Sequence, residues 1–305
     1  MKKIFIYSWL VFFAMVGLSA CNNEENEVDT ANSIFAGDLV PGEMNEFDKW
    51  LLENYIYTYN IQVKYRLDDN ETDVKYDLVP ADYDKAFALA KIVKYLWMEA
   101  YDEVWGLQTT RVYVPKLIQM VGNVAYTESG MILGQAEQGM KVTLFKVNDL
   151  DLDNLNVDEL NEFYFKTMHH EFTHILNQRK PYDVNYDLIT ESDYVGSDWY
   201  QISGTEALQK GFISNYAMDR GSEDFAEMMS IYVTSTADIW ENYLKIAEPD
   251  PSSPYYNPNV NGRAIIEKKF AIVYKYMKES WNVDLDELRA VVQRRQADFP
   301  MLFND

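Results

Sequence analysis

Five residues in the middle of the chain, His170-Glu171-Phe172-Thr173-His174, form the pattern HExxH. In an α-helix, residues four apart lie one turn apart on the same face, so the two imidazoles can bind one metal ion. The glutamate between them is typical of a general base that takes a proton from water. The chain has three histidines, and all of them lie within residues 169–174. The pattern therefore predicts one zinc ion per chain, bound by a helix of residues 157–178.

The third histidine of this cluster precedes the pattern. Each residue of a helix is rotated by about 100° from the one before it, so His169 points away from the face that His170 and His174 share. We expect His169 in solvent or in a second layer behind the ligands, and not as a ligand.

A third ligand has to come from another part of the chain, because a catalytic zinc ion usually has three protein ligands and one open position. No histidine remains, the lone cysteine is Cys21, and Lys180 occupies the last position of the longer pattern HExxHxxGxxH. A carboxylate is therefore expected, as in sites with two histidines and one glutamate. The best candidate is Glu223, in a helix capped by Ser222. Glu227, one turn on, is expected to accept a hydrogen bond from a histidine ring, and an exchange of these two roles is left open.

The predicted glutamate helix has two different faces. Ala226 and Ser230 are small and share the face of the glutamates, so this helix could approach the HExxH helix closely. Phe225, Met229 and Val233 point elsewhere and are expected in the core.

The hydrophobic pattern of the remaining chain predicts an α+β fold, with a mixed sheet region at residues 43–150 and a mainly helical part at 151–305. The acidic stretch 149–156 lacks the glycine and glutamate of a calcium loop, and we interpret it as a polar loop and helix cap. The tyrosine-rich segment 178–209 predicts either a substrate cleft or an ordered loop on the HExxH helix. Helices are expected at 43–55, 82–104, 157–178, 263–279 and 285–297, and strands at 57–67, 73–78, 111–121, 123–127 and 141–147.

The first residues indicate export and anchoring. Residues 1–20 have the positive start and short apolar run of a signal peptide, and Leu18-Ser19-Ala20-Cys21 resembles a bacterial lipobox. We expect acylated Cys21 to attach the protein to a membrane by its lipid alone, through a polar tether of residues 21–42. The folded domain is expected at 43–305. The net charge of −22 argues against nucleic acid as a partner.

The HExxH pattern, followed by the segments Gly211–Tyr216 and Glu223–Glu227, resembles the putative zinc-binding metallopeptidase lipoproteins, also called substrate import-associated zinc metallohydrolase lipoproteins. The resemblance implies a zincin-like fold of the gluzincin group, with Glu223 as the third ligand. It also implies that Tyr216 matches a tyrosine that stabilises the transition state in some gluzincins. The expected location is the outer membrane of a Gram-negative bacterium, beside a TonB-dependent importer. The acidic residues after Cys21 resemble surface-export signals.

These residues predict hydrolysis of amide bonds in a peptide or glycopeptide substrate by a zinc-activated water, with Glu171 as general base. The alternative is a substrate-binding component of an importer that keeps the zincin scaffold without turnover. A nucleophilic serine or cysteine is disfavoured, because no histidine lies outside the cluster and Cys21 is expected to carry lipid.

Overall fold

The computed structural model describes residues 44–67, 76–127, 130–132, 134–137 and 141–303. The predicted signal peptide, Cys21 and the tether to residue 42 lie outside them. The chain divides into two compact units, residues 1–48 and 49–305, and only residues 44–48 of the first are described. No helix among the described residues is long and apolar enough to cross a membrane.

The first half of the described chain contains two long helical stretches, each with a π-helical turn inside it. The stretch predicted at 82–104 is confirmed, and Asp82 caps it by accepting hydrogen bonds from two backbone N–H groups. The elements are α2 (Glu46–Leu51), η3 (Leu52–Ile56), α3 (Tyr57–Tyr59), α4 (Tyr83–Val93), η5 (Lys94–Met98), α5 (Glu99–Trp105) and α6 (Leu107–Tyr113).

Two predicted strands are partly helical instead. The strand predicted at 57–67 is confined to β1 (Gln62–Lys64), because the preceding helix continues until Asn60 adopts the left-handed conformation, with φ of 56°. The continuation buries Tyr55 and Tyr59 on one helical face. The strand predicted at 111–121 likewise starts late, because Tyr113 ends helix α6 and stacks on Trp105 with ring centroids 5.2 Å apart.

The main sheet has the strand order β1-β2-β6-β5. Strands β1, β2 and β6 are parallel, and β5 pairs with β6 in the antiparallel sense. All four residues of β6 are buried, as expected for the interior of a parallel sheet. The strands are β2 (Leu117–Met120), β5 (Gly134–Glu137) and β6 (Lys141–Leu144), with a separate antiparallel pair β3 (Ala125–Thr127) and β4 (Gly130–Ile132).

Strands β4 and β5 were not predicted, because their glycines suggested turns. Of the strand predicted at 73–78, residues 73–75 lie outside the described residues, and 76–78 are not in a strand.

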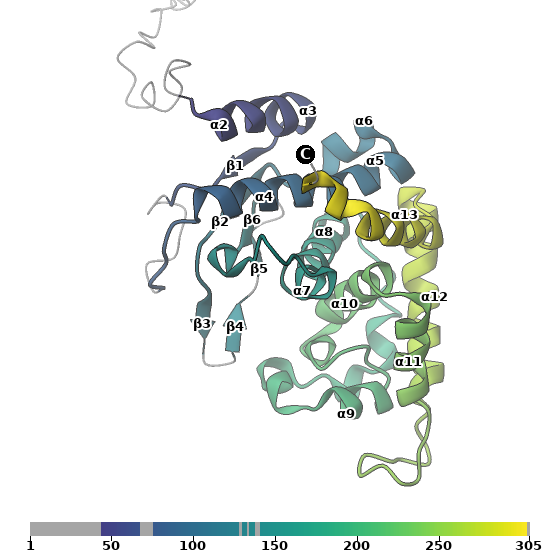
Figure 1. Ribbon diagram of the computed structural model, residues 1–305. Helices are drawn as coiled ribbons and strands as arrows, with labels where there is room; N and C mark the ends of the chain where they lie inside the picture. Colours follow the sequence, from purple (N-terminus) through teal and green to yellow (C-terminus); the bar gives the residue numbers. More distant parts are fainter. Residues whose placement is uncertain (1–43, 68–75, 128–129, 133, 138–140, 304–305) are drawn as a thin grey trace, which may run out of the picture. The chain divides into compact units, whose positions relative to one another are not determined.

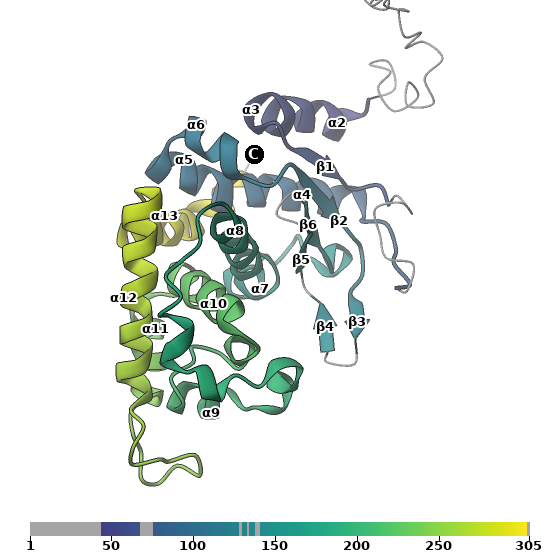
Figure 2. The ribbon, with the colours of Figure 1, turned by 180° about the vertical axis from the view of Figure 1, so that it is seen from behind.

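The second half is helical, as predicted (Figures 1 and 2). The acidic stretch 149–156 is a loop that ends in a helix cap, where Asn156 accepts a hydrogen bond from the N–H of Asp158. The elements are η6 (Val147–Asp149), α7 (Val157–Leu160), η7 (Asn161–Phe165), α8 (Lys166–Arg179), η8 (Asp187–Ile189), η9 (Glu191–Asp193), η10 (Gly196–Gln201), α9 (Gly204–Gln209), η11 (Tyr216–Met218), α10 (Gly221–Thr234), α11 (Ala237–Ile246), α12 (Gly262–Trp281), α13 (Leu285–Asp298) and η12 (Phe299–Phe303).

Helices α8 and α10 lie side by side (Figures 1 and 2). Ala226 and Ser230 are buried, and so are the predicted core residues Phe225, Met229 and Val233. Small side chains allow two helix backbones to come close. The fold is therefore α+β, mostly helical with a small, largely parallel sheet, and α8 and α10 position the site.

Candidate metal centre

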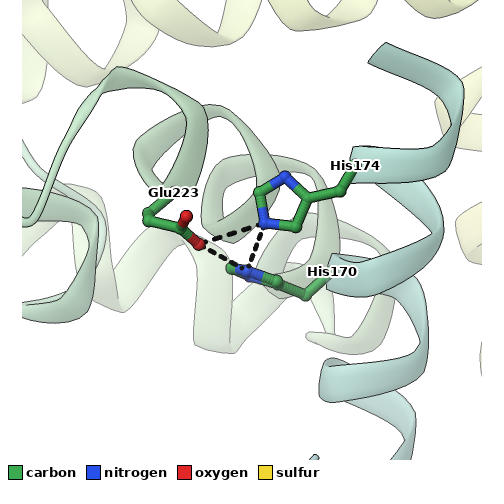
Figure 3. Close-up of side chains that lie close together, drawn as sticks. All are labelled: His170, His174 and Glu223. Atoms are coloured by element: carbon green, nitrogen blue, oxygen red, sulfur yellow. Dashed lines mark hydrogen bonds and ion pairs between the residues drawn. The ribbon is translucent and has the colours of Figure 1, made fainter. Parts of the chain in front are cut away.

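Helix α8 presents two imidazoles to one point. The Nε2 atoms of His170 and His174 lie 3.0 Å apart, and the ring planes are inclined by 82°. The rings lie one above the other because the residues are four apart on a regular helix (Figure 3). His170 is buried, whereas His174 is partly accessible, so the pair can be reached from solvent on one side.

Helix α10 adds a carboxylate to this pair. The Oε2 atom of Glu223 lies 3.0 Å from each Nε2 atom, and its other oxygen points away from the rings (Figure 3). The predicted cap Ser222 is wrong by two residues, because α10 begins at Gly221, its N-cap position is Arg220, and no side chain caps it. A side chain at Gly221 would collide with Asp187, since a Cβ atom there would lie 2.1 Å from Asp187 Oδ1.

The three donor atoms fit a cation. Two Nε2 atoms and one carboxylate oxygen meet at mutual distances of 3.0 Å. However the protons are placed on the two nitrogens, at least one of the three contacts brings together two lone pairs or two N–H groups. One ion about 2.0–2.2 Å from each donor would satisfy all three, and two nitrogens with one carboxylate are a typical zinc donor set. His170, His174 and Glu223 can therefore hold a metal ion.

Glu227 contacts the second ring nitrogen of His170, Nδ1. Its Oε1 atom lies 3.0 Å from His170 Nδ1, and its Oε2 atom accepts hydrogen bonds from Ser214 Oγ at 2.7 Å and Lys166 Nζ at 3.2 Å. Burial alone would raise the pKa of Glu227, but Lys166 and His170 hold it well below its usual value. Glu227 therefore stays ionised and can accept the N–H at Nδ1, which leaves the Nε2 lone pair for a metal.

The same contacts control the charge of His170. Burial lowers its pKa, but hydrogen bonds to Glu223 and Glu227 outweigh burial and raise the pKa to about 9. Glu223 shows the reciprocal effect, because the two imidazoles outweigh burial and hold its pKa well below the usual value. The geometry thus favours Glu223 for the ligand position and Glu227 for the supporting one.

The two residues proposed for chemistry lie beside this group. Glu171 is half-buried on α8, next to His170 in the sequence. Tyr216, in η11, places its ring 5.7 Å from the ring of His170. Burial raises the pKa of Tyr216, and the negative charges of Glu223 and Glu171 raise it further. The Tyr216 hydroxyl therefore keeps its proton and can donate a hydrogen bond.

His169 is not in solvent, so that alternative was wrong. It is fully buried, and its Nδ1 atom lies 2.9 Å from the hydroxyl of Tyr101. Burial lowers its pKa to about 3, so the ring is neutral. The reason is the aromatic layer behind α8, where Tyr101 also packs edge-on against Phe172. His169 is therefore part of the layer that supports the helix.

The tyrosine-rich segment 178–209 was predicted to be either a substrate cleft or an ordered loop, and its two parts behave differently. Its inner residues pack on α10: Tyr182 stacks on Phe225 with ring centroids 4.3 Å apart, and the Tyr194 hydroxyl donates a hydrogen bond to Asp224. Further along, Trp199 lies edge-on against Tyr216 at 4.9 Å. The inner part is therefore an ordered loop, but the contacts that hold it are with α10, whereas the prediction placed it on the HExxH helix. Trp199 reaches the neighbourhood of the three donor residues through Tyr216.

Sequence reasoning missed three residues at this site. Ser214 and Lys166 bind Glu227, and Arg220 lies 3.4 Å from Glu223. Only Lys166 had a usable signal, because it is four residues before His170 and therefore on the same helical face. The contacts of Ser214 and Arg220 depend on how the loop before α10 folds, which no periodicity predicts.

Comparisons with known proteins agree with this geometry. A family model described as a putative zinc-binding metallo-peptidase matches residues 41–286. The crystal structure of a putative zinc-binding metallo-peptidase from Bacteroides caccae is 43% identical, with a TM-score of 0.68, over 85% of this chain and 94% of that chain. A search of curated proteins gave no match.

Proposed function

The chain belongs to the family of putative zinc-binding metallopeptidases, and from this premise we propose that it is a zinc-dependent peptidase whose single zinc ion is held by His170, His174 and Glu223. The observation that carries the proposal is the convergence of three donor atoms at 3.0 Å from one another, two on α8 and one on α10. Glu227 supports it, because an ionised carboxylate at Nδ1 orients the His170 ring.

The chain's own residues divide the work of amide hydrolysis. A zinc ion at this site would supply a Lewis acid, which makes water more acidic and polarises a carbonyl group. Glu171 accepts a proton from the attacking water and passes it to the leaving nitrogen, so the C–N bond breaks to give a carboxylate and an amine. Tyr216 donates a hydrogen bond to the carbonyl oxygen of the substrate as negative charge develops on it.

The proposal extends to fold group and location. The HExxH helix and the glutamate helix support a zincin-like fold of the gluzincin group. The lipobox-like residues Leu18–Cys21 support an outer-membrane lipoprotein that acts beside a nutrient importer, on peptides or glycopeptides.

The first test is metal content combined with turnover. The chain from residue 22 is purified without chelator, and zinc is determined for the wild type, Glu223→Ala and Glu171→Gln. We expect about one zinc per chain in the wild type and in Glu171→Gln, and little in Glu223→Ala. Glu171→Gln should lower turnover of a peptide library by about 10²- to 10⁴-fold.

Glu159→Gln is the matched control, because Glu159 is exposed on α7 and outside the metal group. It should change neither zinc content nor turnover. A chain that binds no zinc even after reloading would contradict the proposal and favour the binding component of an importer. Full activity of Glu171→Gln would contradict the assignment of the base.

A further inference from the structure

One positively charged side chain lies at the edge of the metal group, which consists of His170, His174 and Glu223. Arg220, the residue before α10, has its Nε atom 3.4 Å from Glu223 Oε1, the oxygen that points away from the imidazoles. The same Nε donates a hydrogen bond to Asp219 at 2.7 Å. The Arg220 side chain is 67% exposed, although Glu223 beside it is buried. The guanidinium is therefore held at one edge and open to solvent elsewhere.

The surroundings make this cation unusual. The chain carries a net charge of −22, and four acidic side chains gather around the metal group: Glu171, Glu223, Glu227 and Asp219. The other cation described at this group, Lys166, is bound to Glu227. Arg220 is thus the cation that a substrate arriving at His174 and Glu223 would meet first.

A role in stability explains Arg220 poorly. An ion pair with a solvent-exposed guanidinium contributes little to stability, because water screens it. Its two contacts use the Nε atom and leave the terminal nitrogens without a described partner. Those nitrogens form the fork that binds a carboxylate through two parallel hydrogen bonds.

We infer that Arg220 is a specificity-determining residue that binds a carboxylate group of the peptide substrate close to the bond that is cut. The inference rests on the proposed peptidase function and deepens it by naming the substrate class. The carboxylate can be the free C-terminus of a peptide or the side chain of an acidic residue, since both offer the same two oxygens.

The position of Arg220 sets the distance from the scissile bond. A single carboxylate group, that of Glu223, separates its Nε atom from the donor atoms that face the metal. An extended peptide advances about 3.3 Å per residue. The recognised carboxylate is therefore expected about one or two residues from the scissile amide.

The test uses matched peptides and the zinc-loaded chain from residue 22. In the first set, two otherwise identical peptides end in a free carboxylate or in an amide. The set is made twice, with the C-terminus one residue and two residues after the cleaved bond. A second pair ends in amides and carries Glu or Gln at the same positions. We expect the wild type to prefer one carboxylate form by about 10- to 100-fold in kcat/KM, mainly through KM. The pair that shows the preference identifies the source of the carboxylate.

Three variants connect the preference to Arg220. Arg220→Gln should abolish it, Arg220→Lys should retain only part of it because an ammonium lacks the planar fork, and Arg220→Glu should reverse it. Arg179→Gln, an exposed arginine on α8, is the matched control and should keep the preference. Binding of the same peptides to Glu171→Gln, measured by calorimetry, gives the same comparison without turnover.

The outcomes separate this inference from the proposed function. Cleavage with equal kcat/KM for acid and amide forms, or a preference that survives in Arg220→Gln, overturns the role of Arg220 and leaves the peptidase standing. If no peptide is cleaved, calorimetry still tests the role of Arg220. Tighter binding of the carboxylate peptide to Glu171→Gln, lost in Glu171→Gln/Arg220→Gln, supports the role. Equal binding of both peptides to both variants overturns it.

Discussion

Helix α10 carries two buried charged clusters on different faces, and they are built in opposite ways. On one face, Glu223 and Glu227 meet the imidazoles of His170 and His174. One residue further round, Asp224 meets the ammonium of Lys269 at 2.6 Å, and both side chains are fully buried.

The difference between the clusters lies in how their charges are balanced. Lys269 pairs one to one with Asp224 and also donates a hydrogen bond to the carbonyl of Gly211. Where His170, His174 and Glu223 meet, three donor atoms lie 3.0 Å from one another, and no arrangement of protons satisfies all three contacts. A buried cluster whose contacts are all satisfied is a structural feature, whereas one whose donor atoms protons alone cannot satisfy indicates a cation site. The comparison predicts that metal changes the stability of the cluster of His170, His174 and Glu223. The stability of the Lys269–Asp224 pair should change only when one partner is removed.

The largest effect on stability is expected from Lys269→Met, which leaves the Asp224 carboxylate buried without its ammonium. Removing one partner of a buried ion pair costs about 3–5 kcal/mol. Burial already raises the pKa of Asp224 and lowers that of Lys269, so each depends on the other to stay charged. Urea unfolding of the zinc-loaded protein measures the change in the free energy of unfolding.

The double variant Lys269→Met/Asp224→Asn is the control, because it removes both charges and keeps the side-chain sizes similar. It should recover much of the lost stability. Zinc content should stay near one per chain in both variants while they are folded. Loss of zinc from folded Lys269→Met would break the comparison, because it would make the pair part of the metal site.

A smaller effect is expected from pH, and its sign should differ between the zinc-free and zinc-loaded proteins. Without metal, the pKa of His170 is about 9, above its ordinary value of 6.5. The folded state then binds a proton more tightly than the unfolded chain, so this stabilisation is complete below pH 6.5 and is lost as pH rises through 9. Its size is at most roughly 3 to 4 kcal/mol, because one pKa unit corresponds to about 1.4 kcal/mol.

Zinc binding competes with protonation of the same imidazoles, so the zinc-loaded protein should instead lose stability as pH falls. Urea unfolding at several pH values between 6 and 9, with and without chelator, measures both slopes. His170→Gln should remove the slope of the zinc-free protein. Parallel slopes for the two forms would show that metal and proton do not share this site.

The grouping of the candidate ligands could be predicted from the sequence where helical spacing determines the geometry. His170 and His174 are four residues apart, and so are Glu223 and Glu227, which places each pair on one face of a helix. Arg220 was not found, because its contact with Glu223 depends on the turn before α10. The wrong cap concerns the same segment: α10 begins at Gly221, two residues before the predicted start, where a side chain would collide with Asp187.

Prediction of the fold was weaker in the first half of the chain. Aromatic residues favour strands, yet Tyr57–Tyr59 continue a helix because that continuation buries Tyr59 beside Tyr55. Strands β4 and β5 begin with glycines, which are typical of turns, and each is only three or four residues long, which is too short to show an alternating pattern.

The smallest effect is expected from Glu227→Gln, and it sharpens the division of roles within the metal cluster. The amide keeps an oxygen that can accept the N–H of His170 but loses the charge that holds the ring, so zinc affinity should fall by about 10- to 100-fold. Competition with a fluorescent chelator measures the affinity. Lys166→Met should have less effect, because Lys166 is 36% exposed and its charge is partly screened by water. A loss as complete as that of Glu223→Ala would instead make Glu227 the ligand and Glu223 the supporting residue, since only a directly bound carboxylate is indispensable to the ion.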